Sequence, residues 1–572
     1  MASPSPIDAL SEQGPARIHT KTMICFIAVN LIYFAQLVSL VGSGFLANYM
    51  GQSVGDTKST VWYTSCITIL TVVLNPPIGQ AADYWGRKTI LVFLPLTGVA
   101  GSIIISRAHS SGTLIAGFAI LGVNYGCQSL SLAVMSEILP RDHRPMAQAV
   151  GNISSGVGAI VSLFMGAGLL QDGKIENYRI FWYITAGIYA IASLGCFIGY
   201  NPPPRDLQLS LTTSQKLKRL DWGGYALFGP ALVLFCIALS WSQNPYSWDS
   251  VNILAPFIIG IVALIVFIIY ELRFKRDGML NYDLWQHRNF GIAMFVIFVE
   301  GIAFIAANSY FAFQVSLVYD ASLLSAGGNF ALMFVTTSVF SPLFGLWSSK
   351  RKVLRLPLII GALLLLVFFI LLAASNIDTP RYAFWIYPIV SGIGLGSLLP
   401  LSMVASQFAT PPELIALTSS MMICVRSLGG SIGLAINNAV IHNALDKELA
   451  KKIAAATLPL GLPSSSLPEL IQALASQNRQ AVAAVPGITP QIAQAAVGGM
   501  KRAYVIAFRN SWIVSAAFCA ILLIACVFVK EQADEFDKRI DAPVESGPES
   551  LEDEEKKREA TVEVSHEENS KL

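Results

Sequence analysis

Long apolar runs recur along the chain, and they restrict its fold more than any other feature of the sequence. Each has about 20 residues, the length at which a helix crosses the ~30 Å hydrocarbon core of a bilayer. Hydrophobic residues make up 54% of the 572 residues and charged residues 13%, too few polar side chains to cover soluble domains of this size. The sequence therefore predicts an all-α polytopic membrane protein and argues against a soluble enzyme or a nucleic-acid binder.

Fourteen runs are long enough to be predicted as transmembrane helices. They lie at 22–44, 61–82, 89–107, 112–138, 148–170, 180–200, 222–241, 252–270, 290–316, 326–347, 355–374, 383–406, 413–441 and 505–529. The eight cysteines all fall inside apolar segments without a metal-binding spacing, so we expect small packing residues and no metal site.

The Lys and Arg residues of the short loops predict the orientation of the spans. If the N-terminus is cytosolic, the short inner segments carry 18 Lys and Arg residues and the short outer loops carry 5. This asymmetry follows the positive-inside rule, and an even number of spans then places both termini in the cytosol. We expect the protein in the cell membrane, with the vacuolar membrane as the alternative.

Two short patterns recur at a nearly constant offset, which predicts an internal repeat. Pro76 to Gly79 and Pro342 to Gly345 both read P-x-x-G before a basic turn, 266 residues apart, and Gly126 and Gly396 begin a second similar pair. Transporters are often built from two such halves with the substrate site between them. The predicted divisions are an N-terminal tail (1–21), a six-helix bundle (22–200), a cytosolic linker (201–221), two additional helices (222–270), a cytosolic loop (271–289), five helices of a second bundle (290–442), a long extracellular loop (443–504), its last helix (505–530) and an acidic disordered cytosolic tail (531–572).

The turn after the second span reads Gly79-Gln-Ala-Ala-Asp83-Tyr-Trp-Gly86-Arg87-Lys88. Glycines permit a tight turn and close helix approach, and Arg87 can bind a carboxylate in bidentate fashion, with Glu137 as a plausible partner. This pattern resembles the G-x-x-x-D-x-x-G-R-[RK] loop of the major facilitator superfamily. The resemblance implies two six-helix bundles plus two inserted helices, and an inner gate formed by these residues. The phosphate-binding pattern G-x-x-x-x-G-K-[ST] does not occur in the sequence, which disfavours an ATP-driven pump.

Further stretches resemble the fungal trichothecene efflux pump group and, more generally, fourteen-span drug:proton antiporters. They are 33–36, 41–44, 201–205, 220–224, 240–241 with Trp248, and 426–433. The resemblance implies proton-coupled export of a small amphipathic toxin, metabolite or drug, without a cofactor. Two places depart from the antiporter pattern: Phe118 stands where an Arg is common, and 162–167 fills the place of a degraded glycine motif.

Two charged residues lie deep inside predicted spans, where an unpaired charge is costly. Glu300 lies about ten residues into its span and Arg426 about thirteen into its own, which places both near the middle of the bilayer. We expect Glu300 to bind and release a proton and Arg426 to bind an anion, counter a carboxylate or brace two helices. The alternative for both is a packing role.

Several polar side chains inside the spans are candidates for a substrate cavity, and interhelical hydrogen bonds are the alternative for each. They are Gln36, Asn124, Gln128, Asn308, Gln314 and Tyr310.

The resemblance and the intramembrane charges together lead us to expect a secondary active transporter. Its expected partners are the lipid bilayer, a small-molecule substrate and protons, and we expect a monomer. A ferric-siderophore importer of the same fold and a carrier-like sensor without net flux are the alternatives. Patterns of a catalytic triad or nucleophile elbow are missing from the spans, so we do not expect an enzyme.

Overall fold

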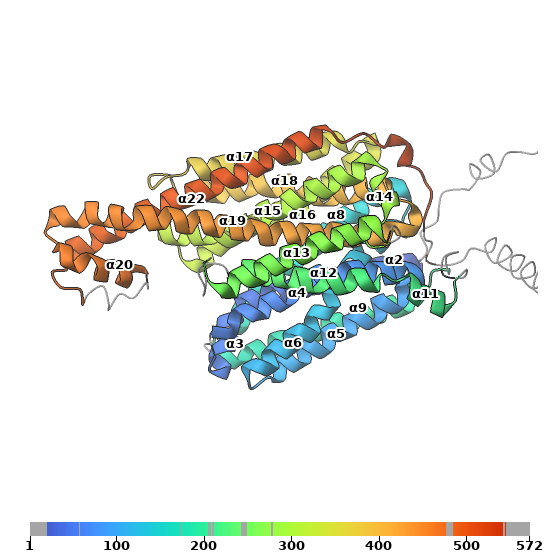
Figure 1. Cartoon of the computed structure of the whole chain (residues 1–572), viewed down its shortest axis with the longest axis horizontal. Helices are drawn as coiled ribbons and strands as arrows, with labels where there is room; N and C mark the ends of the chain where they lie inside the picture. The colour runs from blue at the N-terminus through green and yellow to red at the C-terminus, as the bar shows by residue number, and fades with distance from the viewer. Residues whose placement is uncertain are drawn as a thin grey trace, which may run out of the picture.

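The computed structural model describes residues 20–56, 58–172, 174–203, 208, 211–241, 249–275, 278–475, 484–541 and 544. In this part of the chain fourteen helices are long and apolar enough to cross a membrane, and they run side by side as a bundle (Figure 1). The predicted all-α fold with fourteen spans is therefore confirmed. Outside the described residues lie 1–19 of the predicted tail 1–21, residues 204–205, Trp248 and the acidic residues after 544.

Six spans form the N-terminal bundle. They are α2 (Thr20–Phe45), α4 (Val61–Trp85), α5 (Arg87–Arg107), α6 (Ser111–Val123) continued by α7 (Gln128–Glu137), α8 (Arg144–Leu169) and α9 (Tyr178–Gly199). A 3-10 turn, Asn124–Cys127, separates α6 from α7 and interrupts the fourth span near its middle. The short helices α3 (Ala47–Val54) and α11 (Thr213–Arg219) lie in the connections.

The inserted pair consists of α12 (Trp222–Trp241) and α13 (Val251–Arg273), which pack on each other beside α4 (Figure 1). The C-terminal bundle contains α15 (Arg288–Tyr319), α16 (Leu323–Arg351), α17 (Arg355–Ala374), α18 (Ala383–Phe408), α19 (Ile415–Thr457) and α22 (Pro490–Val527). The short α14 (Tyr282–Trp285) precedes α15, and α20 (Leu467–Ala475) lies between α19 and α22.

The two bundles meet through a pair of equivalent crossings, which agrees with the predicted repeat. Gly79 of α4 packs on α19, where a Cβ would lie 2.1 Å from Ser420 Oγ. Its counterpart Gly345 of α16 packs on α8, where a Cβ would lie 2.9 Å from the carbonyl oxygen of Pro145. Each half thus offers the glycine of its P-x-x-G pattern to the fifth helix of the other half, and small residues are what allow membrane helices to approach this closely.

Residues 443–475 and 484–504 form a largely helical extension where a long loop was predicted. The 43 residues of α19 reach about 65 Å at 1.5 Å per residue, more than twice the hydrocarbon thickness. α22 begins at Pro490, and the two helices leave the bundle together (Figure 1). A separate apolar cluster that includes Ile453, Leu470 and Ile492 holds α19, α20 and α22 together. The spans predicted at 413–441 and 505–529 are therefore the bilayer-length parts of these two longer helices.

The first part of the acidic tail is ordered, so the predicted disorder of 531–572 is wrong for this part. Residues 528–541 and 544, here called the C-terminal strap, cross the end of the bundle at which α22 finishes. Asn289 and Lys530 exchange two hydrogen bonds, of 2.8 and 3.0 Å, and Phe536 and Val544 are buried. The prediction of disorder rested on the acidic composition of the whole tail. It missed a short stretch whose carboxylates pair with basic residues on the bundle.

Candidate functional site

Glu300 and Arg426 form an ion pair between α15 and α19, with Nε–Oε2 and Nη2–Oε1 distances of 2.6 and 2.9 Å. Each residue lies about 17 Å along its helix from the same end of the bundle, so the two are at equal depth. The Glu300 side chain is 1% exposed, whereas Arg426 keeps 22% of its side chain accessible. The bidentate geometry orients both side chains and offsets the cost of placing charge at this depth.

Glycines set the distance between the two helices that carry this pair. A Cβ on Gly301 would lie 2.1 Å from the carbonyl oxygen of Arg426, and one on Gly429 would lie 2.1 Å from that of Phe298. Backbone-to-backbone contact brings Glu300 and Arg426 within direct hydrogen-bonding distance. The sequence left open whether Arg426 counters a carboxylate or braces two helices. In the structure it does both, because its ion pair with Glu300 joins α19 to α15.

Aromatic and polar groups surround the exposed side of Arg426. Its guanidinium lies 4.9 Å from the centroid of the Phe304 ring, a cation–π contact. Tyr33 of α2, which is 4% exposed, faces Arg426 from the N-terminal bundle, and its hydroxyl lies beside Gln128 and Ser155. Tyr33 was not among the predicted site residues, although it lies one helical turn before Gln36.

Residues 300, 304 and 308 share one face of α15, since they are spaced by four. Asn308 is exposed, and it lies farther along α15 than the ion pair. The structure thus places Gln128 and Asn308, among the predicted cavity residues, on the same side of the bundles as the Glu300–Arg426 pair.

The other predicted cavity residues lie inside the bundles, where they hydrogen-bond to neighbouring helices. Gln36 donates to the carbonyl oxygen of Asn124, with a donor–acceptor distance of 3.2 Å, and both side chains are fully buried. Gln314 donates to Ser375 and accepts from Trp512, and Tyr310 donates to Asn438. The side chains of Gln36, Gln314 and Tyr310 thus make interhelical hydrogen bonds, whereas Asn124 accepts the bond from Gln36 through its backbone carbonyl.

Phe118, at the place where related antiporters often carry an Arg, lies in an aromatic cluster. Its ring stacks on Tyr63 with centroids 5.1 Å apart and meets Trp182 edge-on at 5.2 Å. The side chain is fully buried. This position therefore holds a packed aromatic side chain instead of a charged one.

The predicted inner-gate residues meet at one end of the bundle, here called the motif end. Gly86, with a φ of +90°, makes the turn between α4 and α5 and places Arg87 beside Asp83, with a nitrogen–oxygen distance of 3.2 Å. Arg87 also pairs with Glu137 at the end of α7, and all three side chains are buried. Lys88 lies apart from this cluster, where it donates to Asn201.

Asp83 also links the two bundles directly. Its Oδ2 accepts a hydrogen bond of 3.3 Å from the backbone amide of Leu417, in the first turn of α19. A carboxylate is stabilised there because the first amides of a helix lack partners and carry partial positive charge. A second link joins Ser129 and Ser420, whose hydroxyl oxygens are 2.8 Å apart. The bundles are therefore closed on each other at the motif end.

The C-terminal strap supplies charge to the equivalent crossing of the other half. The repeat places Ser349 where the first half has Asp83, so α16 lacks the carboxylate. Asp541 of the strap instead pairs with Arg141 and with Arg144, the first residue of α8, and its side chain has no exposed area. On the C-terminal bundle, Phe536 of the strap packs on Phe408 with ring centroids 4.9 Å apart. The strap thus bridges both bundles at the motif end.

Comparisons with known proteins agree with this architecture. The sequence profile of the fungal trichothecene efflux pump family matches residues 14–566. Efflux pump FUS6 of Gibberella fujikuroi is 23% identical, over 92% of this chain and 93% of that protein. Trichothecene efflux pump TRI12 of Fusarium sporotrichioides is 24% identical, over 84% of this chain and 81% of that protein.

Solved structures show the same fold at low sequence identity. The human organic anion transporter MFSD10 aligns with a TM-score of 0.52 at 13% identity, over 88% of this chain and 98% of its own. The Escherichia coli fucose:proton symporter FucP aligns with a TM-score of 0.50 at 12% identity, over 90% of this chain and 100% of its own. Because the family profile covers nearly the whole sequence and the bundle has the major facilitator fold, the chain belongs to the fungal trichothecene efflux pump family and is a membrane transporter rather than an enzyme.

Proposed function

We propose that this transporter exports a small amphipathic toxin, secondary metabolite or drug by alternating access, in exchange for protons. The Glu300–Arg426 pair carries the proposal, because it is a buried carboxylate held by one removable partner midway along the bundle. The similarity to two fungal efflux pumps, FUS6 and TRI12, supports the outward direction of transport. In this proposal the motif end faces the cytosol and the protein works as a monomer in the cell membrane.

The first step of the proposed cycle is opening of the motif end. Substrate reaches the bundle interior only when the bundles part there, so the hydrogen bond from Leu417 to Asp83 and the Ser129–Ser420 contact must break. Reformation of these links closes the motif end behind the substrate. Neutral hydroxyl contacts and one amide–carboxylate bond are individually weak, about 1 to 3 kcal/mol each, so repeated opening is feasible.

Proton exchange follows from the competition for Glu300. When substrate or helix movement draws Arg426 away, the carboxyl is left unpaired inside the bilayer and takes up a proton, since an isolated charge there is costly. Return of Arg426 releases that proton. One proton moving down about 100 mV supplies roughly 2.3 kcal/mol, enough for about a fifty-fold gradient of a neutral solute. The proton gradient then supplies the free energy, and the scheme requires no bound cofactor.

Reconstituted vesicles test this assignment with a radiolabelled trichothecene as probe. The full chain is compared with Glu300→Gln and with Glu448→Gln, a matched loss of one carboxylate on the extension of α19, where Glu448 is paired with Lys452. We expect a pH jump to drive probe movement in the wild type and in Glu448→Gln. Glu300→Gln is expected to retain probe-for-probe exchange and to lose the response to the pH jump.

Two outcomes contradict the proposal. Undiminished pH-driven transport by Glu300→Gln removes this carboxyl from the coupling step. Vesicles that move a ferric siderophore but not the trichothecene under the same gradient assign the protein to a different substrate class.

A further inference from the structure

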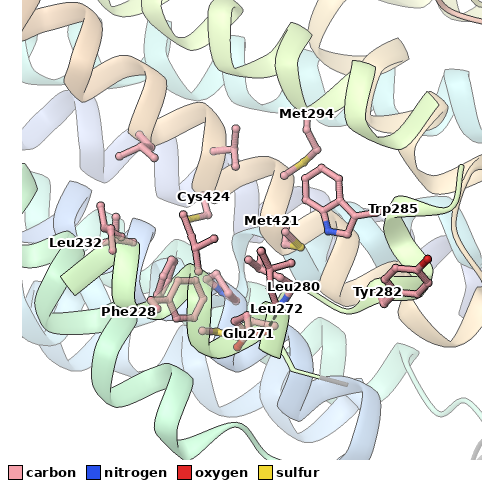
Figure 2. A pocket seen from close by; sticks show the side chains of 17 residues that line it. Phe228, Leu232, Glu271, Leu272, Leu280, Tyr282, Trp285, Met294, Met421 and Cys424 are labelled. Carbon is pink, nitrogen blue, oxygen red and sulfur yellow. Dashed lines mark hydrogen bonds between the residues drawn. The ribbon is translucent and has the colours of Figure 1, made fainter. Parts of the chain in front are cut away.

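A cavity of about 860 Å³ lies outside the Glu300–Arg426 site, between the inserted pair and the helices of the two bundles (Figure 2). Its walls come from α12, α13, α14, α15 and α19, with Pro76 of α4 at one side. Apolar and aromatic side chains dominate the lining, among them Phe228, Leu232, Leu272, Trp285, Met294 and Met421. Protein interiors are close-packed, and cavities of about 300–1,000 Å³ are typical of sites for drug-sized ligands.

The cavity is reached from the apolar outer surface of the bundle. Leu272, Tyr282 and Trp285 line it and are 68%, 66% and 48% exposed. α13, which contributes Ile268 and Leu272, is the most apolar of the wall helices and has most of its span on the bundle surface. An occupant therefore arrives from the bilayer, near the motif end, where α13 finishes and α15 begins.

One buried carboxylate interrupts the apolar lining. Glu271, in the last turn of α13, lines the cavity and is 3% exposed (Figure 2). Its Oε2 accepts a hydrogen bond of 3.0 Å from the backbone amide of Leu280. Its Oε1 has no hydrogen-bond donor among the described residues.

A second buried carboxylate faces the first. Asp221, 1% exposed, caps α12 through a hydrogen bond of 2.9 Å from the Gly224 amide to its Oδ1, and its Oδ2 has no donor in the described part of the chain. A Cβ on Gly224 would lie 2.0 Å from Asp221 Oδ2 and 2.8 Å from Glu271 Oε1, so these two oxygens are at most about 5 Å apart. The close approach explains why the stretch Asp-Trp-Gly-Gly needs its second glycine.

Two facing carboxyl oxygens without donors require a proton or a positive group between them, since like charges at this distance repel, and a pair that shares one proton still carries one negative charge. The cavity wall beside them is aromatic, and aromatic faces attract organic cations. A phosphate or carboxylate head group would meet the same charges unfavourably. The chemistry of the wall thus fits an apolar molecule with one positive charge.

The cavity is also separate from the Glu300–Arg426 pair while sharing a helix with it. Met421, Cys424 and Leu428 face the cavity from α19, whereas Arg426 on the same turns points to Glu300. We propose that the cavity binds an amphipathic organic cation taken from the bilayer, with its apolar body between α13 and α19 and its positive charge beside Glu271, behind which Asp221 adds a second carboxylate. This second site goes beyond the proposed function and does not depend on proton exchange at Glu300.

Tetraphenylphosphonium and tetraphenylborate test the proposal, because the two ions have nearly the same size and shape but opposite charge. Equilibrium dialysis of the purified full chain in uncharged maltoside micelles measures their binding. We expect the cation to bind saturably and the anion not to compete. Glu271→Gln is expected to weaken cation binding by at least about tenfold. This is a low value for the loss of one attraction between two charges about 4 Å apart in a site that excludes bulk water.

Three matched variants locate the site. Asp283→Asn removes an exposed carboxylate from the adjacent segment and is expected to leave affinity unchanged. Ile268→Trp, which adds bulk at the exposed wall, is expected to reduce binding, and Glu300→Gln is expected to retain it. Trp285 gives a second measurement, because a cation in the cavity should quench its fluorescence. The difference in quenching between wild type and Trp285→Phe isolates this contribution. The measurement does not depend on a carboxylate variant that folds.

Several results would overturn the proposal. Equal binding of the two ions would make the cavity an unselective apolar space that lipid chains fill. Loss of binding in Glu300→Gln with full binding in Glu271→Gln would place the cation at the other site. Quenching that is unchanged by Trp285→Phe would likewise exclude this cavity. Failure of proton-coupled transport leaves all of these measurements unaffected, so the two proposals are separable.

Discussion

Asp541 of the C-terminal strap holds the two bundles together at the motif end, and its replacement by Asn should release the strap. Its Oδ1 accepts a hydrogen bond of 3.0 Å from Arg141 Nη2, and its Oδ2 pairs with Arg144, which is 1% exposed. Removal of one partner from a buried ion pair costs about 3–5 kcal/mol. Asn keeps one acceptor oxygen, so we take the lower value of about 3 kcal/mol, which corresponds to about a hundred-fold increase in the undocked strap.

A cysteine at Val544 measures this equilibrium, because the side chain is 3% exposed while the strap is docked. Val544→Cys is placed in a background that carries Cys66→Ser, since Cys66 is the partly exposed native thiol. We expect the rate of maleimide labelling in membranes to rise about a hundred-fold in Asp541→Asn, in proportion to the undocked population.

Asp534→Asn is the matched control, since it removes an acidic side chain that is exposed on the same strap. Its labelling rate should equal that of the parent protein. Equal rates for Asp541→Asn and Asp534→Asn would show that the Asp541 ion pairs do not hold the strap. A parent protein that labels as fast as a free peptide would show that the strap is not docked in the membrane.

Three further predictions follow from the contacts between helices. Gly79→Leu should force α4 from α19 and open the motif end, measured as faster maleimide labelling of Ser420→Cys. Glu300→Gln should lower the free energy of unfolding by about 2 kcal/mol by leaving Arg426 unpaired, less than for a fully buried pair because Arg426 is 22% exposed. The double variant with Arg426→Gln should recover most of the lost thermal stability without recovering pH-driven transport. Gly499→Leu should separate α22 from α19 in the extension, where a Cβ would lie 2.7 Å from a backbone carbonyl oxygen, and increase proteolysis there.

Neighbouring or similar glycines provide the controls. Gly112→Leu and Gly498→Leu introduce the same side chain where no atom lies within 4 Å of the added Cβ. Unchanged labelling in Gly79→Leu, or equal proteolysis of the Gly498 and Gly499 variants, would contradict the close contacts. A double variant at 300 and 426 that is less stable than either single variant would show that the two side chains do not compensate each other's charge.

Local sequence patterns were sufficient for the spans and for the gate. Each apolar run is long enough to cross the bilayer by itself, because a membrane helix satisfies its own backbone hydrogen bonds. Asp83 and Arg87 lie close together on either side of the turn at Gly86, so their contact follows from the short motif that contains all three residues. Glu137 joins them because the fourth span ends at the same end of the bundle as the second, which the count of spans already implied.

The polar residues inside the spans were harder to assign. Gln36 shares a helix face with Ser39 and Ser43, and Asn124 shares one with Gln128 and Ser131, but such a polar face can line a cavity or an interhelical contact, so the pattern does not say which of the two it faces. Lipid and protein interior are equally apolar, and the hydrophobic pattern that orients a soluble helix is weak in a bilayer. The sequence predicts how deep each residue lies in the bilayer. It does not predict how each helix is rotated about its axis, and so does not predict what a given side chain faces.

The sequence by itself determined the number of membrane-spanning helices, their likeness to a transporter family and the depth of the two buried charges. Tertiary structure decided that Glu300 meets Arg426, that the strap supplies Asp541 where the repeat has lost a carboxylate, and that Asp221 faces Glu271 across 50 residues of chain. The physical reason is distance along the chain: hydropathy and turn patterns arise from neighbours within a few residues, whereas these pairs form only when separate helices pack against one another.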